Sequence, residues 1–287
     1  MKNLTIIYVT ARKEPCIEWF KDSIVSQCDT MPEFIVIDAN GIHGEKPKPT
    51  LWQGEHRVMG QDWWANSNSR NTGLAQVQTE WVAFVDDRSV PAPTWMDAVR
   101  DAMAGRYIVA GSYEKRHNMK VENGKIIDPG TQNSMDNRWE HMEKYQLPNP
   151  YPCAGNWTYG CGIAMPTEWA LQVGGFEEAM DGIGFEDCIF GMMCANNGYP
   201  ICYDMRMHLI EDRTPGLIGT TYRREDKGTS PADKSHRSLE LFGTAKNTSN
   251  RHLLLQSRQF VQRGQPFPKL FVPREDWFDG QPIVELG

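Results

Sequence analysis

Residues 69–99 read SRNTGLAQVQTEWVAFVDDRSVPAPTWMDAV, and this stretch decides the fold class. At its centre, WVAFV (81–85) is a continuous apolar run, which is typical of a strand buried on both faces. The residues before it (69–78) and after it (94–105, which Gly105 closes) favour helices. A buried strand between two helices indicates a parallel sheet with helices packed on it.

The same alternation continues outward in both directions. Apolar strands are predicted at 4–10, 34–38, 107–111, 161–165 and 200–204, and helices at 15–25, 166–173 and 185–197. We therefore predict an α/β fold with a mainly parallel central sheet. Regular patterning fades between 112 and 160, and a stretch of this length inside a compact domain predicts a functional insertion.

Composition favours a globular protein. The chain has 287 residues, of which 40% are hydrophobic and 23% charged. Its apolar runs are shorter than a membrane span, and its first residues differ from a signal peptide. We therefore expect a soluble, cytoplasmic protein with no membrane span. The seven cysteines favour buried free thiols over disulfides or a zinc site, because their number is odd and no C-x-x-C spacing occurs.

Charge is unevenly distributed along the chain. The net charge is −7, which disfavours a protein that coats nucleic acid. Residues 216–263 contain nine basic and four acidic side chains, a balance of +5 that leaves −12 for the remainder. This basic segment could fold over an anionic ligand, or it could be a solvated surface.

Two nucleotide-binding motifs are missing from the sequence. No G-x-G-x-x-G follows the opening strand, and no G-x-x-x-x-G-K-[ST] occurs. This argues against a dinucleotide-dependent hydride-transfer enzyme and against a P-loop enzyme.

Two acidic pairs are the candidates for chemistry. Asp86 and Asp87 end a buried strand, where a divalent metal carrying a diphosphate would compensate their charge. The pair could equally belong to a turn or a helix cap before Pro91. Glu186 and Asp187 begin a helix after a glycine-rich turn, and the electrostatics of a helix N-terminus could by itself explain acids at that position.

Taken together, the motifs resemble a known family. The 69–99 stretch is similar to the (A/S)RN-x-G…FxDDD…P…W core of family 2-like glycosyltransferases of GT-A fold. The later GCGIAMPTEWALQVGGFEEAMDGIGFEDCIFGMMCANNGYP resembles their acceptor-side half, with a GGF(D/E)E turn and an ED helix. The resemblance covers about residues 1–212. It implies inverting transfer from a nucleotide-diphosphate sugar, with a UDP-sugar favoured, to a hydroxyl of a saccharide or small-molecule acceptor.

The resemblance also implies roles for particular residues. Donor-binding residues would be Thr10, Arg12 and Asp38 around the nucleoside, Arg70 and Asn71 bracing the donor, and Asp86 and Asp87 at the diphosphate. Asp187 would be the catalytic base, with Glu186 positioning the acceptor. A divalent cation, Mn²⁺ or Mg²⁺, would be held by Asp87 and His208, although a lone histidine is more often structural. Acceptor-binding candidates are Trp157, Gly160 and Gly162, because a flat ring beside a glycine-rich segment suits a sugar face.

Arg88 departs from the family pattern, which has a third acid at this position. An arginine cannot ligate a cation, so one metal ligand is missing. Asp87 and His208 could hold the metal with fewer protein ligands, which we favour. Alternatively, Arg88 could itself neutralise the donor diphosphate.

The expected domain organisation is a GT-A domain over 1–215 and an irregular C-terminal extension over 216–287 that packs on it. Within the domain, 1–111 would bind the nucleotide sugar, 112–160 would be the insertion, and 161–215 would carry the acceptor and catalytic groups. Two alternative functions stay open: a glycosyltransferase acting on modified bases of DNA, and a non-catalytic protein of GT-A fold that binds sugar nucleotides or glycans.

Overall fold

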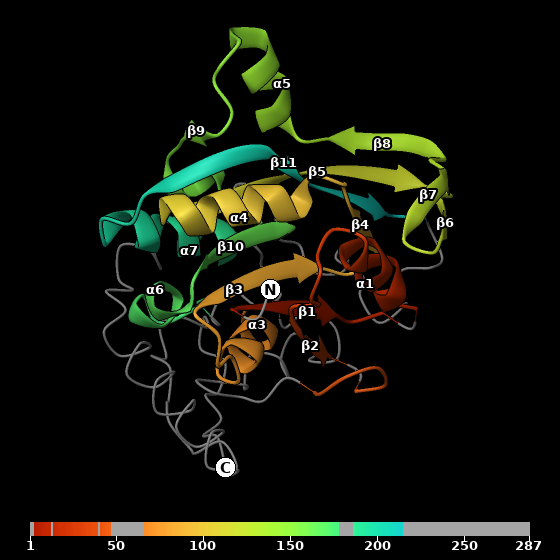
Figure 1. Cartoon of the computed structure of the whole chain (residues 1–287), viewed down its shortest axis with the longest axis horizontal. Helices are drawn as coiled ribbons and strands as arrows, with labels where there is room; N and C mark the ends of the chain where they lie inside the picture. Colours follow the sequence, from red (N-terminus) through yellow and green to blue (C-terminus); the bar gives the residue numbers. More distant parts are fainter. Residues whose placement is uncertain (1–2, 13, 40, 47–65, 178–185, 215–287) are drawn as a thin grey trace, which may run out of the picture.

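The computed structural model describes residues 3–12, 14–39, 41–46, 66–177 and 186–214. Its main sheet has the spatial order β2 (Glu33–Asp38), β1 (Leu4–Thr10), β3 (Trp81–Asp86), β10 (Gly162–Pro166), β5 (Ile108–His117), β11 (Ile201–Asp212) and β4 (Ser89–Pro91) (Figure 1). The strands predicted from apolar runs are all present.

The central strands are mainly parallel, as predicted. β1 runs parallel to both β2 and β3, and β11 runs parallel to β5. β10 is antiparallel and lies between β3 and β5, so it joins the two parallel groups. β4 is antiparallel at the β11 edge.

Helices cover both faces of the sheet, and the side chains of each strand alternate between two cores. In β3, Val82 and Phe84 face one core, whereas Ala83 and Val85 face the other. The first core is closed by α3 (Asn66–Leu74), α6 (Thr167–Gln172) and α7 (Glu186–Asn196). The second is closed by α1 (Ile17–Val25) and α4 (Trp95–Gly105). Burial on both faces explains why these strands read as continuous apolar runs.

The region between 112 and 160 contains regular elements that its sequence pattern does not predict. β5 continues to His117, and the hairpin of β6 (Lys120–Glu122) and β7 (Lys125–Asp128) follows. Then come β8 (Thr131–Met135), α5 (Asn137–Tyr145), β9 (Tyr151–Pro152) and the 3-10 turn η1 (Gly155–Trp157). β8 pairs with β5 and β9 with β11, while α5 projects from the body (Figure 1). Most of their side chains are polar or partly exposed, so these elements give no regular apolar pattern.

Three further observations bear on the expectations from sequence. The seven cysteines, all in described positions, are free thiols, as predicted, but only Cys161 and Cys194 are buried and the other five are partly exposed. Each helix that the structure describes is too short or too polar to cross a membrane. The expected extension 216–287 lies outside the described residues, so the division into domains stays a prediction.

Candidate active site

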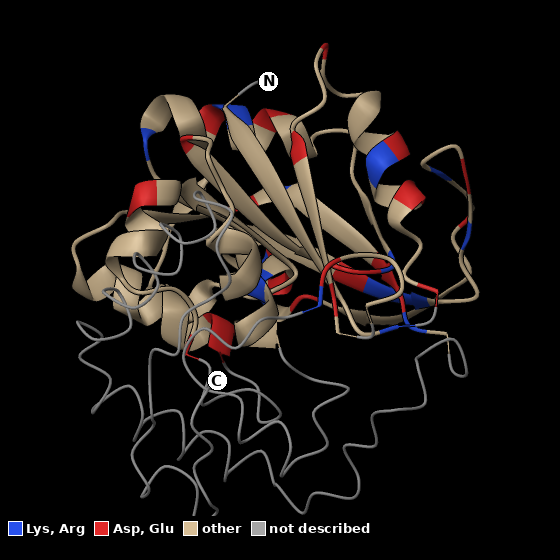
Figure 2. Ribbon diagram, turned by 90° about the horizontal axis from the view of Figure 1, so that it is seen from below, with Lys and Arg blue, Asp and Glu red and all other residues tan. Residues whose placement is uncertain are grey.

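The carboxyl ends of β1, β2 and β3 meet at one edge of the sheet. In the strand register, Thr10 lies beside Asp38, and Val9 lies beside Asp86. Figure 2 shows acidic and basic residues next to one another where the central strands end. Ligands of open α/β sheets bind at this kind of edge. The structure therefore brings Thr10, Asp38 and Asp86 to one place, as the sequence predicts.

Asp87 is the buried carboxylate of this edge. Its side chain is 7% exposed and pairs with Arg12 at 2.9 Å between Nε and Oδ1. Thr10 Oγ1 donates a hydrogen bond to the other carboxylate oxygen. Burial raises the pKa of Asp87 to about 6, although Arg12 and Thr10 act to lower it. Asp87 is thus already compensated by protein groups.

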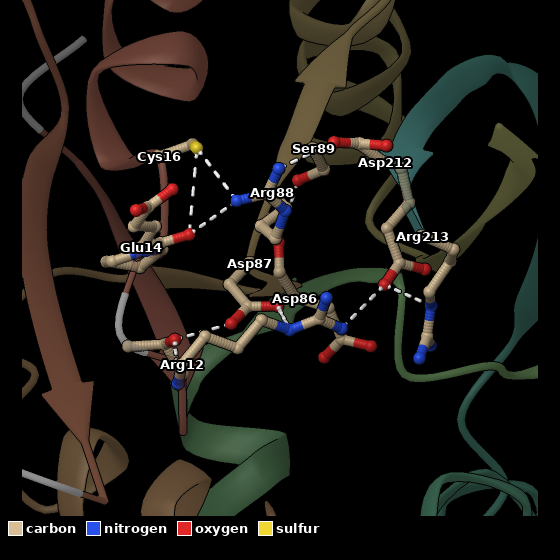
Figure 3. Close-up of polar contacts among 12 residues, drawn as sticks. Arg12, Glu14, Cys16, Asp86, Asp87, Arg88, Ser89, Asp212 and Arg213 are labelled. Atoms are coloured by element: carbon tan, nitrogen blue, oxygen red, sulfur yellow. Dashed lines mark hydrogen bonds and ion pairs between the residues drawn. The ribbon is translucent and has the colours of Figure 1, made fainter. Parts of the chain in front are cut away.

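Arg12 also links Asp87 to two residues that sequence reasoning missed. Its Nη2 lies 3.2 Å from Oε1 of Glu211, and the same oxygen lies 2.6 Å from Nε of Arg213 (Figure 3). Acids and arginines therefore alternate across the strand ends. The Nη1 of Arg12 is buried and has no hydrogen-bond partner within the described part of the chain.

Arg70 connects the two acidic pairs. Its Nη2 lies 2.8 Å from Oδ1 of Asp86, and its Nη1 lies 2.8 Å from Oε1 of Glu186. The Arg70 side chain is 1% exposed, and its guanidinium packs 5.1 Å from the ring centre of Phe176. Burial lowers the pKa of Arg70, but the charges of Asp86 and Glu186 outweigh burial and raise it above the ordinary value. Arg70 is therefore a permanent cation between the donor-side and acceptor-side motifs.

The two acids that flank Arg70 differ in access to solvent. The side chain of Asp86 is 30% exposed, whereas that of Glu186 is 7% exposed. Burial and the neighbouring Asp187 raise the pKa of Glu186. Asp86 is consequently the acid of this group that a ligand can reach, and Glu186 is an internal support.

Asp187 lies in the first turn of α7, where the acid-rich helix start was predicted. Its Oδ2 accepts a 2.7 Å hydrogen bond from the backbone N–H of Gly160, and its side chain is half-buried. The carbonyl of Gly160 in turn accepts from Nη2 of Arg70 at 3.4 Å. One connected network thus runs from Asp86 through Arg70 and Gly160 to Asp187.

Asn71 binds the glycine-rich turn that contains Phe176. Its side-chain amide donates to the carbonyl of Phe176 and accepts from the N–H of Phe176, both at 2.8 Å. This contact holds α3 against the turn that precedes α7. The two neighbouring residues of α3 therefore have different contacts. Arg70 joins Asp86 to Glu186, and Asn71 holds the turn at Phe176.

Arg88 has structural partners. Its Nη2 lies 2.5 Å from Oδ2 of Asp212, and its Nη1 donates to the carbonyl of Glu14 at 2.7 Å. In Figure 3 the guanidinium points toward Cys16 and Asp212, away from the carboxylates of Asp86 and Asp87. Its predicted role at the donor diphosphate stays a prediction, and these contacts do not support it.

His208 lies on β11 beyond an irregularity in the pairing with β5. Its Nδ1 is 2.8 Å from Oγ of Ser112, and its Nε2 is 3.9 Å from Oε2 of Glu114. Burial lowers the pKa of His208, with Glu114 opposing this effect. Its ring also packs against Trp139 at 5.1 Å. These contacts are those of a structural histidine.

The predicted metal ligands do not form a metal site among the residues described. No group of three or more His, Cys, Asp or Glu side chains there could hold a metal ion. Asp87 is paired with Arg12, and His208 is engaged with Ser112 and Glu114. The described donor set therefore does not fit the predicted cation held by Asp87 and His208.

The remaining predicted residues have clear places. Asp38 is fully buried and accepts hydrogen bonds at 2.9 Å from the N–H groups of Ile42 and His43. Gly162 is the first residue of β10, where a Cβ would make ordinary contact with Leu209 at 3.6 Å. Trp157 is half-buried and its ring packs 5.6 Å from that of Tyr203. Of the three acceptor candidates, Gly160 is the one in direct contact with Asp187.

Comparisons with known proteins identify the fold. No family model and no curated protein matches the sequence. The crystal structure of S. aureus TarS 1–349 has a TM-score of 0.50 at 15% identity, covering 91% of this chain and 72% of that one. The structure of GalNAc-T7 with UDP, GalNAc and Mn²⁺ has a TM-score of 0.54 at 10% identity, covering 92% of this chain and 59% of that one. Both are glycosyltransferases of GT-A-like fold.

The chain has a GT-A fold. In this fold the edge that carries Thr10, Asp38 and Asp86 is the carboxyl end of the parallel strands, and α7 begins next to it. The GT-A assignment made from the two sequence motifs is therefore confirmed. At these levels of identity the likeness establishes the fold alone.

Proposed function

We propose that the chain is an inverting glycosyltransferase that moves a sugar from a nucleotide-diphosphate donor to an acceptor hydroxyl, with Asp187 as the general base. The observation that carries the proposal is the network Asp86–Arg70–Gly160–Asp187. It ties the donor edge of the sheet to a half-buried carboxylate at the start of α7. A transferase needs these two groups beside one another.

The donor side supplies positive charge for a diphosphate. We place Arg12 at the diphosphate, a change from the nucleoside contact expected from sequence, because it has a buried N–H group without a partner in the described residues. Arg213 lies close by on Glu211. Groups of this kind stabilise the charge that develops on a leaving diphosphate. The UDP and GalNAc in the GalNAc-T7 structure support a UDP-sugar as the donor class.

The acceptor side supplies the base. Asp187 accepts from the N–H of Gly160 with Oδ2 and from the N–H of Cys188 with Oδ1, both at 2.7 Å, and each carboxylate oxygen keeps a further lone pair for an acceptor hydroxyl. As the acceptor O–H bond breaks, the proton passes to Asp187 and the oxygen attacks the anomeric carbon. The bond from that carbon to the diphosphate oxygen breaks on the opposite face, so the configuration is inverted.

No step of this proposal passes through a metal ion, because the described residues do not form the predicted cation site. The Mn²⁺ in the GalNAc-T7 structure nevertheless makes metal dependence a quantity to measure. Assays with Mn²⁺, with Mg²⁺ and with EDTA would measure it directly.

The test is a panel of UDP-sugars with saccharide, small-hydroxyl and DNA acceptors, using the wild type, Asp187→Asn and the control Glu168→Gln. Glu168 is an exposed acid on α6. We expect Asp187→Asn to lose transfer while its UDP dissociation constant, from calorimetry, stays within about twofold, and Glu168→Gln to match the wild type. NMR of the product should show an inverted anomeric centre.

Other outcomes would assign the protein differently. Full activity in Asp187→Asn would remove Asp187 from the role of base. UDP-sugar binding with neither hydrolysis nor transfer would identify a non-catalytic sugar-nucleotide-binding protein. Transfer to DNA alone, with a steep loss at higher salt, would identify a nucleic-acid acceptor.

A further inference from the structure

A buried ion pair lies at the start of α5, outside the donor and acceptor groups discussed above. Asp136 is fully buried and Arg138 is 4% exposed. Nε of Arg138 lies 2.9 Å from Oδ1 of Asp136, and Nη2 lies 2.6 Å from Oδ2. Asp136 also caps α5 by accepting from the backbone N–H of Arg138 at 2.9 Å.

Every side-chain nitrogen of Arg138 has a partner. Beyond Asp136, Nη2 donates to the carbonyl of Gly111 at 2.8 Å, and Nη1 donates to the carbonyl of Trp157. By contrast, Arg12, Arg70 and Arg88 each keep one buried nitrogen without a hydrogen-bond partner among the described residues. Burying a charge is costly unless all its donors are satisfied. Arg138 is therefore the most completely fixed of these buried arginines.

Arg138 fixes one side of the segment 157–160. Besides the bond to the carbonyl of Trp157, its guanidinium lies 3.9 Å from the ring centre of Tyr159. The ring of Tyr203, 4.7 Å away, supports the guanidinium from β11. The path of the backbone from Trp157 to Tyr159 is thus set by a cation that cannot move without breaking several contacts.

The other side of the same segment lies on α7. Thr158 Oγ1 donates to the carbonyl of Asp187 at 2.7 Å, and the N–H of Gly160 donates to the Asp187 carboxylate at 2.7 Å. The backbones of Gly155 and Gly191 are in direct contact, since a Cβ on Gly155 would lie 2.3 Å from the carbonyl oxygen of Gly191. The segment is therefore held between Arg138 and the first turns of α7.

We propose that Arg138, held by Asp136, is a positioning residue for Asp187: it fixes the segment 157–160, whose Gly160 N–H orients the carboxylate of Asp187. The inference rests on the proposed function, because it requires Asp187 to be the general base. Misplacing a catalytic group by about 1 Å can cost about 100-fold in rate. A residue that acts in this way affects turnover and leaves donor binding intact.

The experiment compares Arg138→Gln, Asp136→Asn and Thr158→Val with the control Arg116→Gln. Arg116 pairs with Glu114 on β5, with its side chain 20% exposed. We expect kcat for transfer to fall about 10- to 100-fold in the first three variants, with the KM for the donor and the UDP dissociation constant unchanged within about twofold. Arg116→Gln should keep the wild-type kcat.

Unfolding curves establish that each variant is folded at the assay temperature. Thr158→Val removes one hydroxyl and no charge, so it reports on the same segment if the arginine variant fails to fold. Wild-type kcat in folded Arg138→Gln or in Thr158→Val would overturn the inference, as would a loss of UDP binding parallel to the loss of kcat. If Asp187→Asn is itself fully active, the proposed function fails instead, so the two failures are distinguishable.

Discussion

The guanidinium of Arg70 is buried between the carboxylates of two acids. Its side chain is 1% exposed and contacts Asp86 and Glu186, each at 2.8 Å. Arg70 and Glu186 depend most on each other, since a buried charge that loses its partner cannot be solvated in its place. The same cation also reaches Gly160, which carries the hydrogen bond to Asp187.

Arg70→Gln should therefore lower stability as well as activity. Removing one partner of a buried ion pair costs about 3–5 kcal/mol, and we expect a loss of this size in the unfolding free energy measured with urea. The double variant Arg70→Gln/Glu186→Gln should recover part of the loss, because it removes one stranded carboxylate. The single variant Glu186→Gln completes the cycle, and a loss in the double variant equal to the sum of the two single losses would show that Arg70 and Glu186 are not coupled.

Asp87 should make stability depend on pH in a particular direction. Its pKa is about 6 in the folded chain and about 3.9 when unfolded, so the folded state binds the proton more tightly. The unfolding free energy should fall as pH rises from about 4 to about 6 and level off above pH 7. The contribution is at most about 3 kcal/mol.

Urea unfolding of the wild type, Asp87→Asn and the exposed-site control Asp97→Asn between pH 4.5 and 7.5 tests this. The wild type should lose stability relative to Asp87→Asn as pH rises, whereas Asp97→Asn should follow the wild type. Parallel curves for the wild type and Asp87→Asn would rule out the raised pKa.

Several site residues could be predicted from sequence because they belong to local motifs. Arg70, Asp86, Glu186 and Asp187 lie in two short stretches whose composition already indicates a site. Glu211 could not be found in this way, because its partner Arg12 is 199 positions away. A contact over that distance leaves no local pattern in either stretch.

At the scale of elements, η1 and α7 pack so closely that a side chain at Gly155 or Gly191 would clash with the other element. A Cβ on Gly191 would lie 2.0 Å from Oγ1 of Thr158 and 2.1 Å from the carbonyl oxygen of Gly155. This close approach places the N–H of Gly160 beside Asp187. Glycine at 191 is thus required by the neighbouring element, since its own helix would favour alanine.

Gly191→Ala should accordingly destabilise the protein, with Gly162→Ala as the matched control. The methyl group must push η1 from α7, which costs about 2 kcal/mol or more and outweighs the gain of about 1 kcal/mol in helix propensity. At Gly162 a Cβ meets nothing closer than 3.6 Å. Chemical unfolding measures both variants, and a Gly191→Ala protein as stable as the wild type would refute the packing argument.

Elements with apolar runs were predictable, and elements with polar surfaces were not. β3 and the first half of β5 are buried on both faces, so their composition alone identifies them. β8 is exposed along almost its whole length and reads TQNSM, which resembles a loop. β8 forms because the edge of β5 is available for hydrogen bonding. The residues of β8 do not by themselves indicate this pairing.

At the scale of the whole molecule, donor binding should stabilise the fold. The proposed donor residues come from β1, β2, α3 and β3, so a bound UDP would contact elements far apart in the chain. At 100 times its dissociation constant, a ligand adds about 2.7 kcal/mol to the unfolding free energy. For a protein of this size the gain corresponds to about 4–5 °C in Tm.

A thermal shift assay with UDP and with uridine tests this prediction. Uridine lacks the diphosphate that we place near Arg12, so it should give a smaller shift at the same concentration. Arg12→Gln should reduce the UDP shift and leave the uridine shift unchanged. Equal shifts for UDP and uridine in the wild type would show that the diphosphate is not bound where we propose.

The antiparallel strand β10 has a consequence for how the chain is made. β3 ends at Asp86, but the strand that covers its open edge begins at Gly162, roughly 75 residues later. During synthesis at about 5–20 residues per second, the edge of β3 stays unpaired for roughly 4–15 seconds. An exposed apolar strand edge is a template for aggregation in that interval. We therefore expect residues 1–111, expressed without the strand that covers β3, to aggregate more readily than the full chain.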